Sequence, residues 1–178
     1  VTKKDWNEYT QTTKSDYDAS ANLSVNKDGV KVNANANQNI SIQNKDQKGN
    51  TKETTISNGI GVSGELNKDG VNAEAKVNQS ISRQKQDKDG NIKKVTFSSG
   101  VGVSGQVNTD GGVNVGANGE LGVENSSKTH NKDGSVDEKK NKVGSQIGGT
   151  YNIITQDFTV DVSGGVETKR VHTNKDGS

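Results

Sequence analysis

The sequence contains no cysteine, no proline and no methionine, and only 3% of its 178 residues are aromatic. The absence of cysteine excludes disulfide bonds, thiolate zinc sites and thiol nucleophiles. Two Phe, three Tyr and one Trp cannot fill a large conventional core, and hydrophobic residues make up only 25% of the chain. No hydrophobic run is long enough to form a membrane-spanning helix. The missing methionine predicts that these residues are part of a longer chain.

Charge of one dominant sign is also lacking, because 23 basic residues face 22 acidic ones and the net charge is +1. The near balance argues against a disordered, strongly charged tail. Basic and acidic residues are interleaved along the chain, whereas nucleic-acid partners favour clustered Lys and Arg. The composition therefore excludes nucleic acid as the expected partner.

What the chain does have is an internal repeat of 41 residues. The segment GIGVSGELNKDG at residues 59–70 returns as GVGVSGQVNTDG at residues 100–111, and a weaker copy, DASANLSVNKDG, occupies residues 18–29. Repeats of this length indicate an array of similar supersecondary units. The sequence predicts a pre-repeat segment, 1–16, followed by a β-hairpin repeat domain, 17–178, with units at about 18–58, 59–99, 100–140 and 141–178.

Inside each unit, apolar residues alternate with polar ones; Val30, Val32, Ala34 and Ala36 are separated by Lys and Asn residues. A period of two is typical of a β-strand with one apolar face. The same alternation recurs from Tyr17–Val25 to residues 158–166. It predicts an all-β fold, an antiparallel up-and-down meander of about eight long strands built from the 41-residue hairpin repeats.

Asp-Gly pairs separate the strands, and the loop lengths follow from parity, since a one-residue slip would exchange the two faces. The loop at residues 26–29 must be even, which a two-residue Asp28-Gly29 turn or a four-residue loop satisfies. The loops at residues 87–90 and 108–111 must be odd. Their sequences favour a type I turn followed by a glycine with positive φ, which is a three-residue loop.

The apolar face of such a meander must be covered, and three arrangements remain open. Either the sheet closes as a barrel, or copies of the sheet stack face to face, or the apolar face contacts lipid. Apolar alternation of some 9 to 11 residues per strand suits a tilted membrane strand. Aromatic girdles are missing, however, and the apolar face is interrupted by Gln38, Asn58, Gln79, Ser99 and Ser145. These features favour a sheet covered by protein over one exposed to lipid.

Few residues suggest chemistry. Asp87 and Asp89, followed by Gly90, resemble the start of a calcium loop and are weak calcium candidates, but Ser98 stands where the loop requires a bidentate acid. His130 and His172 are the only histidines, and no catalytic motif accompanies them. We therefore expect no enzymatic activity, no catalytic residues and no cofactor. Trp6 and Tyr9 are expected to plug one end of the sheet.

The segments VSGELNKDGVNAEAKVN (residues 62–78) and VSGQVNTDGGVNVGANGELGV (residues 103–123) resemble the β-repeat regions found upstream of the toxin domain in large secreted bacterial polymorphic toxins. The resemblance extends over most of the chain and carries no functional residue across. It implies a non-catalytic structural or delivery module of a secreted or cell-surface bacterial protein, whose partners are the rest of a longer parent chain or copies of itself. The alternative is a membrane-inserting amphipathic β-barrel or pore-forming segment, which would lie in an outer membrane.

Overall fold

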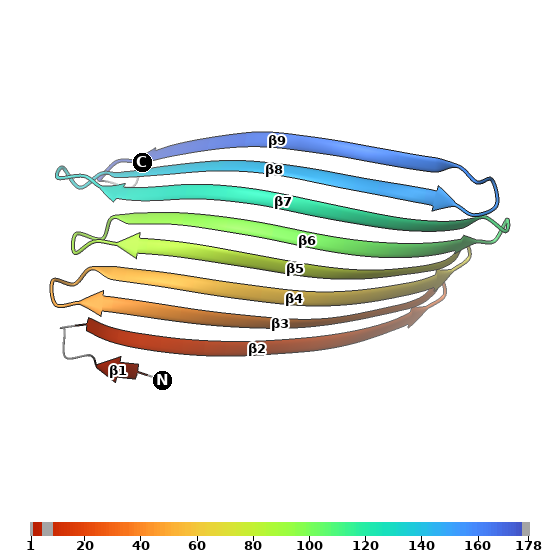
Figure 1. Ribbon diagram of the computed structural model, residues 1–178, viewed down its shortest axis with the longest axis horizontal. Coiled ribbons are helices and arrows are strands. Elements are labelled where there is room, and N and C mark those ends of the chain that lie inside the picture. Colours follow the sequence, from red (N-terminus) through yellow and green to blue (C-terminus); the bar gives the residue numbers. More distant parts are fainter. Residues whose placement is uncertain (1, 5–8, 176–178) are drawn as a thin grey trace.

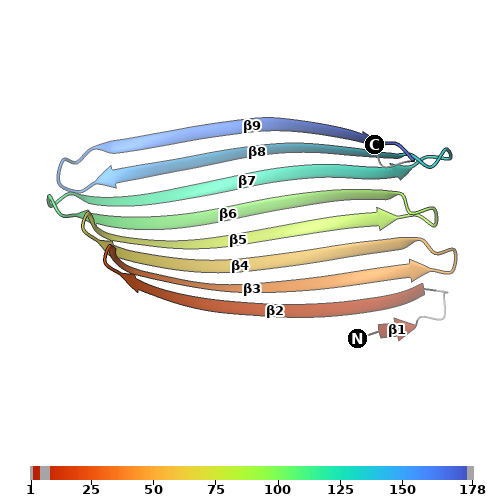
Figure 2. The same ribbon diagram turned by 180° about the vertical axis from the view of Figure 1, so that it is seen from behind.

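The structure is a computed structural model that describes residues 2–4 and 9–175. Within these residues the chain forms one antiparallel sheet without a helix, and the strands lie in chain order (Figures 1 and 2). The strands are β1 (Thr2–Lys4), β2 (Tyr9–Asn26), β3 (Gly29–Asp46), β4 (Thr51–Asn67), β5 (Gly70–Gln86), β6 (Ile92–Asn108), β7 (Val113–His130), β8 (Val136–Asn152) and β9 (Phe158–Thr173). The expected all-β meander with eight long strands is confirmed.

The strands are longer at their polar ends than the alternation predicts. β2 begins at Tyr9 rather than at Tyr17, and β9 continues to Thr173. Residues 9–16, assigned to the pre-repeat segment on sequence, pair in register with residues 39–46 of β3. Backbone pairing requires no apolar side chain, so a strand can extend beyond the alternating segment that reveals it.

Two hairpins turn through two residues. Asn26 pairs with Gly29 and Asn67 pairs with Gly70, so the loop of the first hairpin is Lys27-Asp28, one residue earlier than the two-residue alternative Asp28-Gly29 and shorter than the four-residue alternative. The side-chain oxygen of Asn26 accepts hydrogen bonds from the backbone N–H groups of Asp28 and Gly29. The even parity was correct, but this Asn side chain fixes the turn one residue earlier, and the glycine closes it as a paired strand residue.

Four hairpins turn through three residues, as the parity argument requires at residues 87–90 and 108–111. In one of them the Asp87 N–H donates to the Asn91 carbonyl and the Gly90 N–H donates to the Asp87 carbonyl. Gly90 has a φ of 84°. The same two hydrogen bonds recur in the loops at 46–50, 108–112 and 131–135. The type I turn followed by a glycine with positive φ is therefore confirmed.

In the described residues the sheet is a single open layer, so the closed barrel, one of the arrangements left open, does not form within them. Each long strand pairs only with its neighbours in sequence, and β9 does not pair with β2. No hydrophobic side chain is buried in the described residues. The apolar side chains are gathered on one face of the sheet, and the part of the chain that the structure describes supplies no second layer to cover them.

Candidate functional surface on the two faces of the sheet

The strand register assigns every side chain to one of two faces. We call the face that carries Val101 the apolar face and the face that carries Gly100 the polar face. Directly paired residues form rows across the sheet. One row of the apolar face is Ala19, Ala36, Ile60, Val77, Val101, Gly119, Ile147 and Val162. One row of the polar face is Ser20, Asn35, Gly61, Lys76, Gly102, Asn118, Gly148 and Asp161.

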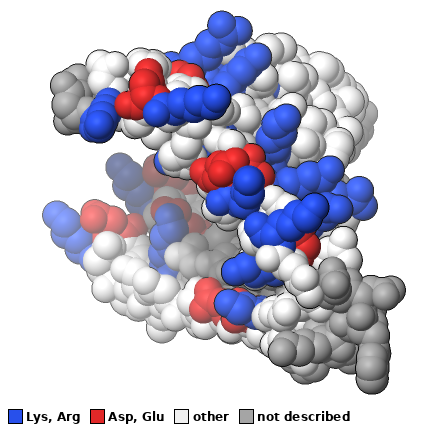
Figure 3. Space-filling view, turned by 90° about the vertical axis from the view of Figure 1, so that its left-hand side faces the viewer, with Lys and Arg blue, Asp and Glu red and all other residues white. Residues whose placement is uncertain are grey.

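The sheet curves so that the apolar face is convex. Val101 is 62% exposed, whereas Gly100 and Gly102 on either side of it are buried. A Cβ atom at Gly100 would lie 2.6 Å from side-chain oxygens on both neighbouring strands. On the apolar face, a Cβ at Gly105 would meet nothing within 4 Å. Side chains converge on the concave side of a curved sheet, which explains why the polar face is rich in glycine. Figure 3 shows the resulting trough, which opens to one side.

One row of the apolar face is polar, and its side chains bind one another. The Gln38 amide donates to the Tyr17 hydroxyl over 3.0 Å, the Asn58 amide donates to the Gln38 oxygen over 3.4 Å, and the Gln79 amide donates to the Asn58 oxygen over 3.0 Å. These hydrogen bonds link β2, β3, β4 and β5. Three of the residues that interrupt the apolar pattern in the sequence, Gln38, Asn58 and Gln79, therefore form an amide ladder, which satisfies part of its own hydrogen-bonding capacity.

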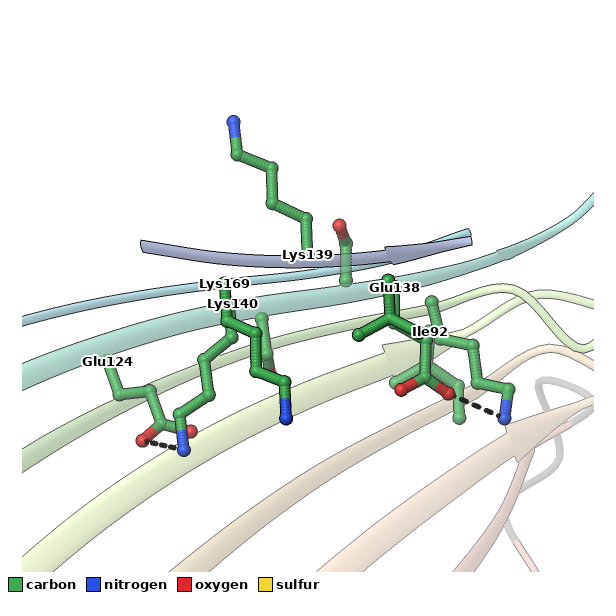
Figure 4. A pocket seen from close by; sticks show the side chains of 10 residues that line it. Ile92, Glu124, Glu138, Lys139, Lys140 and Lys169 are labelled. Carbon is green, nitrogen blue, oxygen red and sulfur yellow. Dashed lines mark ion pairs between the residues drawn. The ribbon is translucent and has the colours of Figure 1, made fainter. Parts of the chain in front are cut away.

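Opposite charges pair on the polar face. The Lys140 ammonium lies 2.9 Å from the Glu124 carboxylate, and this hydrogen bond raises the pKa of Lys140. Both residues line a shallow pocket of about 350 Å³, which also contains Lys169. Figure 4 shows that Lys139 points away from this pocket, toward the opposite side of the sheet. Further ion pairs on the polar face are Lys31–Glu65, Lys76–Glu120 and Lys128–Glu138.

The calcium candidates Asp87 and Asp89 lie in a hairpin loop. One carboxylate oxygen of Asp87 accepts the backbone N–H groups of Asp89 and Asn91, and the other accepts the Asn91 side-chain amide. The Asn91 amide is the main reason that the pKa of Asp87 is lowered. In the described residues, no group of three or more His, Cys, Asp or Glu side chains gathers that could hold a metal. The geometry of Asp87 is that of a turn cap.

The two histidines do not come together. His172 lies 2.6 Å from the Asp137 carboxylate on the neighbouring strand, and this contact raises the pKa of His172. His130 ends β7, and its backbone N–H donates to the side chain of Asn91. Tyr9 is the first residue of β2 and is 51% exposed. Trp6, expected with Tyr9 to plug one end of the sheet, lies outside the described residues.

Sequence reasoning missed a row of cations at one end of the apolar face. Lys52 pairs with Lys85, which pairs with Lys93, on three adjacent strands. On two further strands Lys139 pairs with Arg170. The charged strand ends are visible in the sequence, but only the register reveals that these residues share one face. Extending the parity argument from the loops to the strand ends would have found them.

No helix in the described part of the chain is long and apolar enough to cross a membrane. No protein-family model, no curated protein and no solved structure matches the chain.

Proposed function

We propose that this chain is a non-catalytic structural element whose convex apolar face meets the hydrocarbon of a lipid bilayer, as part of the wall of a membrane-inserted β-sheet. The observation that carries the proposal is the direction of curvature. A curled sheet covered by its own protein in water would place its apolar side chains on the inside. Here they lie outside, and the polar side chains line the concave trough, which is the polarity of strands between lipid and a water-filled interior.

The apolar band has the length that a bilayer requires. On the apolar face, it runs from Ile56 to Leu66 in β4, from Val71 to Ile81 in β5 and from Val95 to Val107 in β6. The first two segments have eleven residues and the third has thirteen. A tilted strand crosses the hydrocarbon layer in about 9–11 residues. Agreement across three adjacent strands, set by register, supports a band rather than scattered apolar positions.

The amide ladder is compatible with lipid because its members bind one another. Isolated amide groups are costly to remove from water, and hydrogen bonds among them offset much of that cost. In the ladder, Asn58 both donates to Gln38 and accepts from Gln79. The hydrogen bonds within this polar row therefore lower the free-energy cost of placing its amide groups against lipid.

An open sheet requires further strands to enclose a pore. The outer edges of β2 and β9 are available for pairing over most of their length, since the short β1 pairs only with Thr10–Thr12. β2 and β9 run in opposite directions, so β9 of one copy and β2 of the next can pair as antiparallel strands. The rest of a longer parent chain or further copies of this chain would supply these strands.

The test is the substitution Val101→Arg, measured by flotation of the protein with neutral phosphatidylcholine vesicles. Because Val101 is 62% exposed, the change should alter stability in water by less than about 0.5 kcal/mol. In the bilayer, Arg on the lipid face near the midplane costs about 2–4 kcal/mol, so vesicle binding should fall by roughly 30- to 1,000-fold.

The matched control is Ser104→Arg, on the same strand but on the polar face. Ser104 is directly opposite Glu74, so the new cation meets an acid and vesicle binding should be retained. Equal binding of the two variants, or no binding of the unmodified protein, would refute the proposal.

A second candidate is the delivery module implied by the resemblance to polymorphic-toxin repeats, with the apolar face covered by protein. The lack of aromatic girdles supports it, since Phe and Tyr together number only five residues. This candidate predicts that the protein forms oligomers in water without lipid. It also predicts that Val101→Arg dissociates them, which analytical ultracentrifugation measures directly.

A further inference from the structure

The cations at the end of the apolar face lie in one row across the sheet. Lys52, Lys85 and Lys93 are adjacent on β4, β5 and β6. Ser127 of β7 follows in this row, which then continues with Lys139 and Arg170 on β8 and β9. Adjacent strands lie about 4.7–4.9 Å apart, so the three lysines of β4 to β6 are immediate neighbours. All five side chains belong to exposed residues. Like charges directly opposite each other destabilise a sheet, so this row lowers the stability of the sheet in water.

No acid lies within this row or between it and the far border of the apolar band. From the row of Val71 to the row of Lys85, every charged residue on this face is Lys or Arg. The lysine ion pairs of the described residues all lie on the polar face. The next acids on the apolar face are Asp46, Asp87 and Asp137, at the loop end. Their carboxylates accept hydrogen bonds from Asn50, Asn91 and Asn131 respectively.

The row stands at one border of the apolar band and has no counterpart at the other. Lys85 follows Ile81, the last apolar residue of its strand on this face, by four residues, or about 13 Å along the strand. A lysine at this distance reaches the headgroup layer when the band lies in hydrocarbon. At the opposite border the loops Lys27-Asp28 and Lys68-Asp69 carry balanced charges. The two ends of the strands therefore present different surfaces to the two sides of a bilayer.

We propose that the apolar face binds an anionic bilayer, with Lys52, Lys85 and Lys93, extended by Lys139 and Arg170, contacting the lipid phosphates at the loop end of the sheet. The proposal rests on the membrane-facing function above and adds the lipid class and the orientation. The charge of the row complements an anionic leaflet, and the adjoining apolar band explains why the occupant is a bilayer rather than a soluble anion. The loops at 46–50, 87–91 and 131–135 then face the anionic side.

The experiment compares binding to vesicles of pure phosphatidylcholine with binding to vesicles that also contain phosphatidylglycerol. The test variant carries Lys52→Gln, Lys85→Gln and Lys93→Gln. Each basic residue at an anionic surface contributes roughly a factor of five to affinity, so the variant should lose on the order of 100-fold on anionic vesicles. Its binding to pure phosphatidylcholine should not change. The substitutions remove repulsion within the sheet, and far-ultraviolet circular dichroism checks that the variant folds.

The control variant carries Lys45→Gln, Lys94→Gln and Lys142→Gln, which lie on the polar face and give the same net charge. We expect this variant to bind anionic vesicles much better than the test variant. Equal losses in the two variants would overturn the proposal, because net charge alone would then explain the affinity. So would an affinity that is independent of phosphatidylglycerol. If the affinity does not depend on phosphatidylglycerol but the protein still binds neutral vesicles, only the proposed lipid class is refuted and the membrane-facing function is retained. No binding to either kind of vesicle would overturn both proposals.

Discussion

Two turn glycines differ in what surrounds them, and this difference gives the sharpest test of the hairpin geometry. Gly70 closes a two-residue loop with a φ of 134°, and a Cβ atom there would overlap the carbonyl oxygen of Val107 on the neighbouring strand. Gly111 lies in a three-residue loop with a φ of 90°, and a Cβ there would meet nothing within 4 Å. Both positions disfavour alanine, but only Gly70 adds a backbone collision.

Gly111→Ala should cost about 1–2 kcal/mol, the usual penalty of a left-handed backbone for a residue with a Cβ. Gly70→Ala should cost about 3 kcal/mol or more, because forced overpacking adds about 1–3 kcal/mol to the backbone penalty. The assay is urea unfolding followed by far-ultraviolet circular dichroism. Hydrogen exchange of the amides of residues 66–71 shows whether the loss is local to the β4–β5 hairpin. Equal costs for the two substitutions, or a larger cost for Gly111→Ala, would refute the described register around Gly70.

Two further predictions concern side-chain contacts. Asn58→Leu removes the central member of the amide ladder and leaves groups of Gln38 and Gln79 without their partner, so it should cost less than about 1 kcal/mol in water and about 1–3 kcal/mol in vesicles. Urea unfolding with and without vesicles measures the difference. The contact with Asp137 raises the pKa of His172, so its stabilisation should be fully present below about pH 6.5 and lost as the pH rises through the folded-state pKa. NMR titration of His172 in the Asp137→Asn variant should show its pKa returning toward 6.5.

Much of the fold is predictable from the sequence because alternation and turn chemistry are both local signals. Gly90 and Gly111 indicate the positions of their loops, and the parity of the loop length determines which faces of the paired strands meet. The starting point of β2 was wrong, since residues 9–16 carry no apolar alternation and join the sheet through backbone pairing. The exact loop at 26–29 was left open between a two-residue and a four-residue form, because an Asn26 side chain that binds two backbone N–H groups leaves no periodic signal.

The candidate surface was harder to predict because it depends on the curvature of the sheet and on the register across several strands. Alternation reveals that two faces exist, but it does not reveal which of them is concave. That choice follows from the steric space at Gly100 and Gly102, which is occupied by the side chains of Asn78, Glu120 and Asn118 on the neighbouring strands. The lysine row required register across several strands, and the amide ladder required side-chain directions within one row.

The open sheet also raises the question of what stabilises it. Each backbone hydrogen bond contributes a net 0.5–1.5 kcal/mol or so, which is comparable to the roughly 1–2 kcal/mol of backbone entropy lost for each ordered residue. Most domains overcome this balance by burying apolar area, at about 25 cal/mol per Å². Here no hydrophobic side chain of the described residues is buried, and Val101, Leu121 and Val162 remain more than half exposed. The apolar face is therefore the main unused source of stability, and whatever covers it should stabilise the sheet. We infer that docking of this face and ordering of the sheet are coupled, which makes the choice between lipid and a second protein surface a question about folding as well as about function.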